Sequence, residues 1–563
     1  MGLDTFNARS RPHLFRRLSR EAFDLLIIGG GITGASTFRD AALRGMRVAL
    51  VEAKDFASGA SGRSSRLIHG GLRYLKTLDL RLVWESCHER NLHLRLNGRL
   101  VRPLPFLIPL YSEKGGRCLQ MRLGAWLYEG MSGFKDRHAH RFLSREETLS
   151  LAPGLPTRGL TGGYLYRDAA VNDTRWTVET LKDGVRNGGM AVNYAPVTAF
   201  LKQNGRVVGA TCCDRIGGAA CDIHARAVVN ATGGSVDRVR RLDQPDLSNL
   251  VRLSKGTHLL FAEKDVPLTV TTAFFSPMDG RPLFLARQDG CFLFGTSDDW
   301  EDTEPDAPRP GQRDVEYLLE SLWQFMPWAN LSRERVRYVY SGFRPLLVRN
   351  GPKADPVAVS RGTLIEVTPS GLISVAGGKL TTARLTALRV LECAIDRIGG
   401  PGTYLPCQTH RLPVGGGGEE SAERLAYWVR QYPRWMDHLR TLYQRYGAEA
   451  HTLCSEAVAL TRRRRVDLSD ALTCAEVRHL CRREMVCTLT DLIDRRASAL
   501  AWNSAKRLRY LRRLSQVIRD ELDMDEETFE AQCRDYQNHL TQFHALPGSP
   551  SALRPPLLQR VQT

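Results

Sequence analysis

The most constraining feature of the chain is a glycine pattern between two apolar segments near its N-terminus. One apolar run leads into Gly29-x-Gly31-x-x-Gly34, and a second apolar run ends at Glu52. A tight turn needs the first glycine, close approach to a pyrophosphate needs the second, and helix–strand packing needs the third. The helix that follows offers amide donors to phosphate, and a carboxylate about twenty residues on can accept from ribose hydroxyls. The pattern predicts a βαβ dinucleotide-binding unit rather than a purely structural turn.

Composition narrows the class of protein and its partners. The 563 residues, 42% hydrophobic and 25% charged, are enough for two or three globular domains. The formal net charge of +18 suits an anionic partner. No nucleic-acid module is recognisable, so an acidic lipid surface or an anionic substrate is favoured over nucleic acid. The 13 cysteines include no Cys-x-x-Cys pair, which predicts neither a disulfide framework nor a metal site and fits a reducing compartment.

Nothing in the sequence predicts a membrane span or a secretion signal. No apolar run reaches the length of about 18 residues that a spanning helix needs. Residues 9–20 are rich in arginine, with Leu14, Phe15 and Leu18 between the cations. This segment could lie on a membrane surface, or it could be a leader that packs on the first strand, and the second interpretation is favoured.

Changes of composition divide the chain. We expect a basic leader over 1–22, nucleotide-binding and interleaved substrate-binding domains over 23–405, a Pro- and Gly-rich linker over 406–418, a helical domain over 419–545 and a tail over 546–563.

Local patterns predict several elements within this division. The dipeptide at 204–205, Asn-Gly, predicts a hairpin. Apolar periodicity predicts helices over 79–97, with His88 and His93 on its surface, and over 383–398, where two glycines end the helix.

Three cations stand directly beside glycines, where small residues leave open space. Arg73, Arg344 and Lys379 each follow a glycine-containing turn. An arginine fork matches phosphate or carboxylate, and lysine supplies a point charge. If the three converge, they form a pocket for a small anion. Each one alone is equally consistent with a surface cation or an ion-pair partner.

His258 and Asp298 are candidates for proton transfer. His258 enters an apolar strand and has the pKa range of a general base, although a hydrogen-bonded core histidine is an equal alternative. Asp298 could cap a turn or orient the base. A serine hydrolase is not supported, because the sequence has no Gly-x-Ser-x-Gly elbow.

Motifs spread over the chain resemble those of one known family, the FAD-dependent glycerol-3-phosphate dehydrogenases of the D-amino-acid-oxidase-like flavoproteins. The matching stretches occur in the family's order: IIGGGITG (27–34), LVE (50–52), SSRLIHGGLRYL (64–75), VNATG (229–233), KGTH (255–258), YSGFRPL (340–346), GGKLTT (377–382) and RREMVCTLTDLIDRR (482–496). The resemblance implies an α/β fold with an FAD-binding Rossmann-like domain, an interleaved antiparallel-sheet substrate domain and a C-terminal all-helical cap.

The resemblance also implies a cofactor, a substrate and site residues. FAD would be held by Gly29, Gly31, Gly34 and Glu52 at its diphosphate and ribose, with Ser64, Ser65, Thr232, Gly378, Leu380 and Thr381 around the rest. The substrate would be sn-glycerol 3-phosphate, bound by Arg344, Arg361, Tyr74 and Asp298, with Arg73, Lys379 and His258 at the reacting end. His258 would take the C2 hydroxyl proton as the C2 hydride passes to flavin N5, giving dihydroxyacetone phosphate.

The family's reduced flavin is reoxidised by a membrane quinone or, in its oxidases, by oxygen. The resemblance and the basic charge favour a quinone and a cytoplasmic protein held peripherally on the inner face of the cell membrane. They leave a homodimer as an open alternative.

The sequence departs from the family pattern at Gly234, Ser297 and Gly362, which leaves room for a paralogue with a shifted substrate. A flavin amine or amino-acid oxidase is a second alternative, although several cations suit a phosphate dianion better than a carboxylate. A membrane or protein-binding module that keeps a structural flavin and a nicotinamide dehydrogenase are further alternatives.

Overall fold

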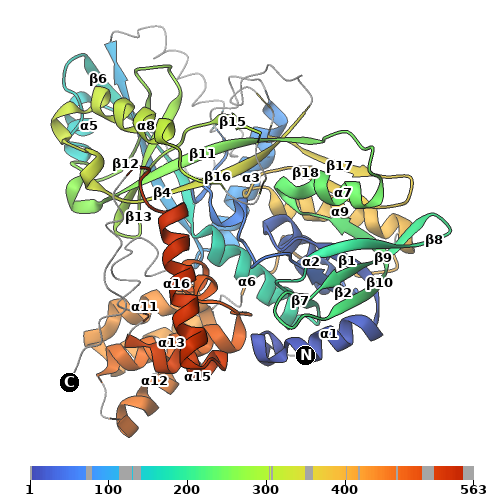
Figure 1. Cartoon of the computed structure of the whole chain (residues 1–563). Coiled ribbons are helices and arrows are strands. Elements are labelled where there is room, and N and C mark those ends of the chain that lie inside the picture. The colour runs from blue at the N-terminus through green and yellow to red at the C-terminus, as the bar shows by residue number, and fades with distance from the viewer. Residues whose placement is uncertain are drawn as a thin grey trace.

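Two β-sheets and a C-terminal group of helices make up the protein (Figure 1). The computed structural model describes residues 3–71, 79–112, 128, 130, 141–302, 305, 308–348, 359, 361–400, 402–415, 419–464, 467–497, 511 and 513–548. The predicted fold class is confirmed: a largely parallel sheet of the nucleotide-binding type alternates along the chain with a largely antiparallel sheet, and helices follow.

The first sheet is built around a buried parallel core. β1 (Ala22–Ile28) lies between β10 (Ala220–Asn230) and β2 (Val48–Val51), and β18 (Ile373–Gly377) and β7 (Met190–Val192) extend the sheet in parallel on either side. All four residues of β2 and six of the seven in β1 are buried. The unbroken apolar runs in these strands follow from burial on both faces of a parallel sheet.

Antiparallel strands complete the first sheet. β17 (Thr363–Val367) pairs with β18, and the hairpin of β8 (Val197–Gln203) and β9 (Arg206–Cys213) pairs with β10. The predicted hairpin turn is confirmed, since Asn204 and Gly205 have φ angles of +52° and +76°.

Several helices pack on this sheet or on one another, among them α7 (Val236–Asp243), which contacts β8, β10 and β18. α2 (Ile32–Leu43) contacts α6 (Asp173–Arg186) and α9 (Ala383–Ile398), and the helix predicted over 383–398 is confirmed. α1 (Arg11–Arg20) contacts β10 and buries Leu14, Phe15 and Leu18 in the core of the sheet. The apolar face of α1 is therefore covered by protein. Arg16 and Arg20 are exposed, whereas Arg11 is buried and pairs with Asp214.

The second sheet forms the other half of the α/β part. Its strands are β3 (Leu67–Ile68), β4 (Val101–Tyr111), β5 (Arg141–Leu143), β6 (Leu160–Val171), β11 (Val251–Ala262), β12 (Thr271–Phe275), β13 (Pro282–Gln288), β14 (Cys291–Gly295), β15 (Asp299–Glu301) and β16 (Val336–Leu347). The chain leaves the first sheet after β2 and again after β10, and it returns each time. Both excursions therefore bring loops of the second sheet to the nucleotide-type sheet.

α3 (Leu80–Leu96) confirms the helix predicted near 79–97. The prediction that both of its histidines lie on the surface was wrong for His93. His88 is exposed, as predicted. His93 is only 4% exposed and meets the Trp176 ring edge-on at a centroid distance of 5.0 Å. Burial lowers the pKa of His93 to about 4, so this side chain is a neutral core residue. The periodicity of α3 could not show that α6 covers this face.

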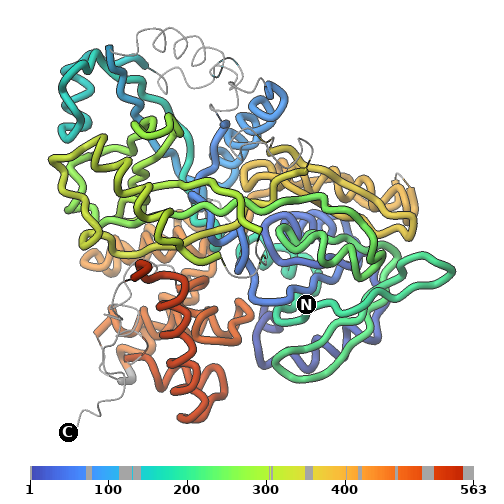
Figure 2. The backbone as a smooth tube through the Cα atoms, turned by 45° about the horizontal axis from the view of Figure 1, so that its top comes forward, coloured from blue at the N-terminus to red at the C-terminus, as the bar shows by residue number. Residues whose placement is uncertain are grey.

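The C-terminal helices have an apolar core of their own and gather at one side of the two sheets, coloured orange to red in Figure 2. They are α10 (Glu419–Gln431), α11 (Met436–Tyr446), α12 (Ala450–Arg464), α13 (Leu468–Arg483), the π-helical segment η13 (Asp491–Arg496), α15 (Ser515–Leu522) and α16 (Glu526–Phe543). No helix in the described part of the chain is long and apolar enough to cross a membrane.

Buried ion pairs join these helices to α6. Arg175 donates to Glu484 at 2.7 and 2.9 Å, and Lys182 donates to Glu179, Glu449 and Glu484 at 3.0, 2.6 and 2.9 Å. Breaking such a pair strands a buried charge, which costs about 3–5 kcal/mol. The network therefore fixes how the C-terminal helices sit on the nucleotide-type sheet.

A second set of ion pairs joins η13 to the loop that follows β2. Asp55 accepts hydrogen bonds from Arg495 and Arg496, and its side chain is fully buried. Burial alone would raise the pKa of Asp55, but Arg496 and Arg495 hold it at about 2.

Candidate active site

The glycine pattern forms a cradle whose first and third positions have no room for a side chain. Gly29, at the end of β1, has a φ of +111°, and a Cβ on it would lie 2.6 Å from the carbonyl oxygen of Ala231. A Cβ on Gly34 would lie 1.9 Å from the carbonyl oxygen of Gly29. A Cβ on Gly31 would meet only Ser61 Oγ, at 3.1 Å. The first and third glycines thus allow β1 and α2 to pack closely, and Gly31 keeps the start of α2 open to a diphosphate.

Glu52 closes the other side of this cradle. Its carboxylate accepts hydrogen bonds from the backbone N–H groups of Gly30 at 2.6 Å and Lys54 at 2.8 Å. Burial raises the pKa of Glu52, against the effect of these amide donors. Each carboxylate oxygen keeps a further lone pair, so the same group can also accept from a ribose hydroxyl.

The segment that carries Ser64 and Ser65 meets the segment that follows β18 at the predicted cofactor side of the site. Thr381 bonds the backbone of His69, accepting from its N–H at 3.1 Å and donating to its carbonyl at 3.3 Å. Gly377 and Gly378 have φ angles of +74° and +95°, and a Cβ on Gly377 would lie 2.5 Å from the carbonyl oxygen of Gly362. Two motifs about 300 residues apart are therefore in direct contact, and Leu380 lies half-buried between them.

The remaining candidate cofactor residues are held by short polar contacts. Ser64 donates through its N–H and its hydroxyl to Asp173 at the start of α6, at 2.9 and 2.7 Å. Thr232 donates its hydroxyl to Asn230 Oδ1 at 2.7 Å.

Arg344 and Arg361 converge on Asp298. Arg344 Nη1 lies 3.2 Å from Asp298 Oδ1, and Arg361 Nη2 lies 3.0 Å from Asp298 Oδ2. Asp298 is 3% exposed and also accepts from the hydroxyl of Ser254. Two guanidinium groups share one carboxylate, so the cluster keeps an excess positive charge. The structure thus brings together three of the residues expected to bind the substrate.

The backbone of β11 makes the room for Arg344. Gly256 pairs with Gly342 across β11 and β16, and a Cβ on Gly256 would lie 2.3 Å from both terminal nitrogens of Arg344. Sequence reasoning did not single out Gly256, although it lies within the KGTH stretch. It also missed Ser61, whose hydroxyl accepts from the Ile32 N–H at 2.8 Å.

His258 lies beside this cluster in a neutral form. It is 3% exposed, its Nε2 lies 2.9 Å from Ser65 Oγ, and its ring stacks on Tyr340 at a centroid distance of 4.9 Å. Burial, then the charges of Arg344 and Arg66, lower the pKa of His258 to about 3. Its buried Nδ1 has no hydrogen-bond partner within the described residues. A buried polar nitrogen of this kind indicates a ligand or water that completes the site.

The other candidate cations are placed differently. Lys379 is half-buried and donates to Ser86 Oγ on α3 at 3.0 Å, so it points toward α3 rather than to Asp298. Arg73 and Tyr74 lie outside the described residues.

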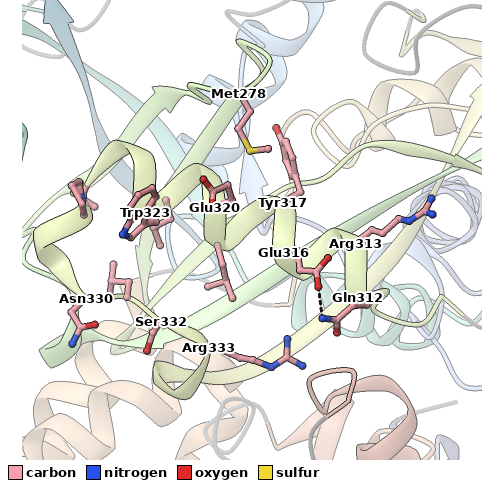
Figure 3. Close-up of a pocket in the computed structure, with 15 residues that line it drawn as sticks. Met278, Gln312, Arg313, Glu316, Tyr317, Glu320, Trp323, Asn330, Ser332 and Arg333 are labelled. Carbon is pink, nitrogen blue, oxygen red and sulfur yellow. Dashed lines mark hydrogen bonds between the residues drawn. The ribbon is translucent and has the colours of Figure 1, made fainter.

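A large groove lies elsewhere on the second sheet, along α8 (Gln312–Phe325). Its volume is about 800 Å³, and Figure 3 shows Met278, Tyr317, Glu320 and Trp323 on its walls. None of the candidate site residues lines it. Cavity size alone therefore does not point to the candidate site, which is distinguished by its convergent cations, its histidine and the glycine cradle.

Comparisons with known families identify the class of protein. Residues 24–384 match the family described as "FAD dependent oxidoreductase", and residues 407–529 match the "C-terminal domain of alpha-glycerophosphate oxidase". The glycine cradle fits the diphosphate of FAD. The buried Nδ1 of His258 has no hydrogen-bond partner among the described residues, which fits a site that a bound group completes. The fold and the site therefore define a flavin-dependent oxidoreductase.

Individual relatives show the family within this class to which the chain belongs. The chain is 32% identical over 543 residues to the aerobic glycerol-3-phosphate dehydrogenase of Staphylococcus aureus, covering 94% of this chain and 96% of that protein. It is 33% identical to the enzyme of Staphylococcus haemolyticus over 516 residues, 89% and 91% of the two chains. The chain belongs to the family of FAD-dependent glycerol-3-phosphate dehydrogenases.

Solved structures show the same architecture. The glycerol-3-phosphate dehydrogenase of Bacillus halodurans, complexed with FAD, has a TM-score of 0.81 and 27% identity, covering 97% of this chain and all of that one. The L-alpha-glycerophosphate oxidase of Mycoplasma pneumoniae, at 18% identity and a TM-score of 0.55, covers 70% of this chain and 99% of that one and shares the fold.

Proposed function

We propose that this protein oxidises sn-glycerol 3-phosphate to dihydroxyacetone phosphate and passes the electrons to a respiratory quinone. The observation that supports this most directly is the convergence of Arg344 and Arg361 on Asp298 beside the neutral His258. A phosphate dianion favours several cations, and the cluster has more positive than negative charge.

The phosphate is the group that orients the substrate. Arg344 and Arg361 present planar forks that can each donate two parallel hydrogen bonds to phosphate oxygens. Asp298 holds both forks in place and accepts from Ser254, so the guanidinium groups are positioned before the substrate arrives. Arg73, Tyr74 and Lys379 are proposed to act at the other end of the substrate.

His258 is proposed to remove the proton of the C2 hydroxyl. In the tautomer that donates from Nε2 to Ser65 Oγ, Nδ1 holds the lone pair and faces no other partner among the described residues. Arg344 is one cause of the low pKa of His258. A phosphate dianion on Arg344 neutralises that charge, so substrate binding raises the pKa and makes His258 a stronger base. FAD, when bound, supplies the oxidant, because its N5 accepts the C2 hydride.

The cofactor residues divide into two proposed roles. Gly29, Gly31, Gly34 and Glu52 hold the diphosphate and ribose of FAD. The remainder of the cofactor is surrounded by Ser64, Ser65, Thr232, Gly378, Leu380 and Thr381.

We extend the proposal to the electron acceptor, the attachment to a membrane and the oligomeric state. The formal charge of +18 supports peripheral binding of a cytoplasmic protein to the acidic inner face of the cell membrane. Reoxidation by a soluble quinone analogue but not by oxygen would support the quinone. Sedimentation with acidic but not neutral vesicles would support the surface attachment, and the mass in solution would separate a monomer from a homodimer.

The test of the reaction is anaerobic. FAD-loaded protein is mixed with sn-glycerol 3-phosphate, glycerol or glycine, and the yellow absorbance of oxidised flavin is followed. We expect fast bleaching with the phosphate ester alone, which Arg344→Ala abolishes while FAD stays bound. The matched control is Arg206→Ala, at an exposed arginine of β9. Bleaching by an amino acid instead would assign the protein to the amine oxidases.

A further inference from the structure

Three side chains of metal-ligand type lie close together near the end of α16, which contacts β16. Figure 1 shows α16 running from the C-terminal helices toward the second sheet. Asp494 lies on η13, His539 on α16, and His544 follows the end of α16. One carboxylate oxygen and two ring nitrogens all lie within 4.8 Å of one another.

The distances suit a metal ion. Asp494 Oδ2 lies 2.8 Å from His539 Nε2 and 3.5 Å from His544 Nε2. Zinc binds imidazole nitrogen and carboxylate oxygen at about 2.0–2.2 Å with tetrahedral geometry, which puts neighbouring ligand atoms about 3.3–3.5 Å apart. The Asp494–His544 separation already matches this spacing, whereas His539 Nε2, which hydrogen-bonds Asp494, must move back by about 0.5 Å.

The hydrogen bond of His544 determines which of its ring nitrogens can bind a metal ion. His544 Nδ1 lies 3.1 Å from the carbonyl oxygen of Val339, and a carbonyl can only accept, so Nδ1 is the donor. The other nitrogen, Nε2, is the one that lies 3.5 Å from Asp494 Oδ2, and it is the atom that would bind the metal ion.

The surroundings resemble the outer shell of a metal site. The hydroxyl of Tyr536 donates to Asp494 Oδ1 at 2.9 Å, and the Val339 carbonyl fixes the ring of His544. His544 also stacks on Tyr338 at a centroid distance of 4.5 Å with an interplanar angle of 13°. Such partners fix the orientation of metal ligands. The adjoining cavity of about 40 Å³ has room for a water as the fourth ligand.

The ligand atoms select the kind of ion. Arg63 and Arg495 also line the cavity, and Arg495 is paired with Asp55 and Asp491. These positive charges act equally on every divalent cation, so the choice depends on the ligands. Two imidazole nitrogens and one carboxylate suit Zn²⁺ and similar transition metals, whereas Ca²⁺ and Mg²⁺ take oxygen ligands.

We propose that Asp494, His539 and His544 bind one Zn²⁺-like transition-metal ion that fastens η13 to the end of α16. His544 extends this link to β16 through its hydrogen bond to the Val339 carbonyl. The role of the ion is structural, because no candidate substrate or cofactor residue is a ligand.

The experiment uses full-length, FAD-loaded protein purified without a histidine tag. The metal content is measured before and after chelation, and ZnCl₂ is then titrated by calorimetry with the melting temperature recorded. We expect one strong site per chain and a melting temperature that rises with Zn²⁺. Asp494→Asn and His539→Gln should each weaken binding by at least about 100-fold, because even outer-shell changes cost about 10- to 100-fold.

The control variant is His410→Gln, at an exposed histidine in the 402–415 segment, which should bind Zn²⁺ like the parent protein. Two results would overturn the proposal. One is a chelated parent protein that rebinds no Zn²⁺. The other is equal binding by the parent and by the Asp494 and His539 variants, which would mark an adventitious ion only. The parent titration decides the question even if a variant fails to fold.

Discussion

Replacing Gly256 by alanine tests the phosphate site without removing any charged group. The new Cβ would lie 2.3 Å from both terminal nitrogens of Arg344, whereas ordinary contacts begin at 3.4 Å, so the guanidinium must retreat by about 1 Å. The flexible end of the arginine can make this movement, and alanine is less costly than glycine in a strand by about 0.5–1 kcal/mol. The protein should therefore fold and bind FAD normally.

The displaced fork should lose its contact with substrate phosphate. A hydrogen bond to a charged group contributes about 1.5–3 kcal/mol, so kcat/KM for sn-glycerol 3-phosphate should fall by about 10- to 150-fold. We expect most of the loss in KM, because the phosphate is bound before and during the reaction.

The assay is anaerobic flavin reduction over a range of substrate concentrations, with FAD content and melting temperature measured in parallel. Gly98→Ala is the matched control, because a Cβ there meets only the Leu94 carbonyl oxygen at 3.5 Å. An unchanged KM in Gly256→Ala protein with normal FAD content would refute the assignment of Arg344 to the phosphate.

Three further predictions follow from other buried groups. His258→Asn should slow flavin reduction by at least about 100-fold with little change in KM, and an unchanged rate in stopped-flow measurements would exclude it as the base. His93 has a folded pKa of about 4 against an ordinary 6.5, so its contribution to stability is complete above pH 6.5 and is lost as the pH falls toward 4, by up to about 1.4 kcal/mol per unit. His93→Gln should flatten urea-unfolding stability over that window, and an unaltered slope would contradict its neutral burial. Asp55→Asn should cost about 3–5 kcal/mol in the same assay, because it removes the buried carboxylate that Arg495 and Arg496 share, whereas Asp437→Asn, at a 94% exposed side chain, should be neutral.

The sequence by itself determined features that depend on neighbouring residues. The spacing of Gly29, Gly31 and Gly34 reflects close contacts that no side chain can enter, so the nucleotide-type βαβ unit could be predicted. The turn at Asn204 and Gly205 likewise follows from backbone conformation, which is a property of single residues. The three cations beside glycines indicated an anion pocket, although spacing could not show which of them meet.

Only the tertiary structure decided which distant side chains approach one another. Arg344 reaches Asp298 because β11 pairs with both β16 and β15, and Arg361 reaches it from the segment before β17, while Lys379 turns toward α3. The burial of His93 and of the apolar face of α1 depends on elements far along the chain. The ligand set of Asp494, His539 and His544 has no local motif, since its members come from two segments about 45 residues apart. The spacing of apolar residues predicts which face of a helix or strand is buried. Tertiary packing decides which element covers that face, and the spacing does not encode it.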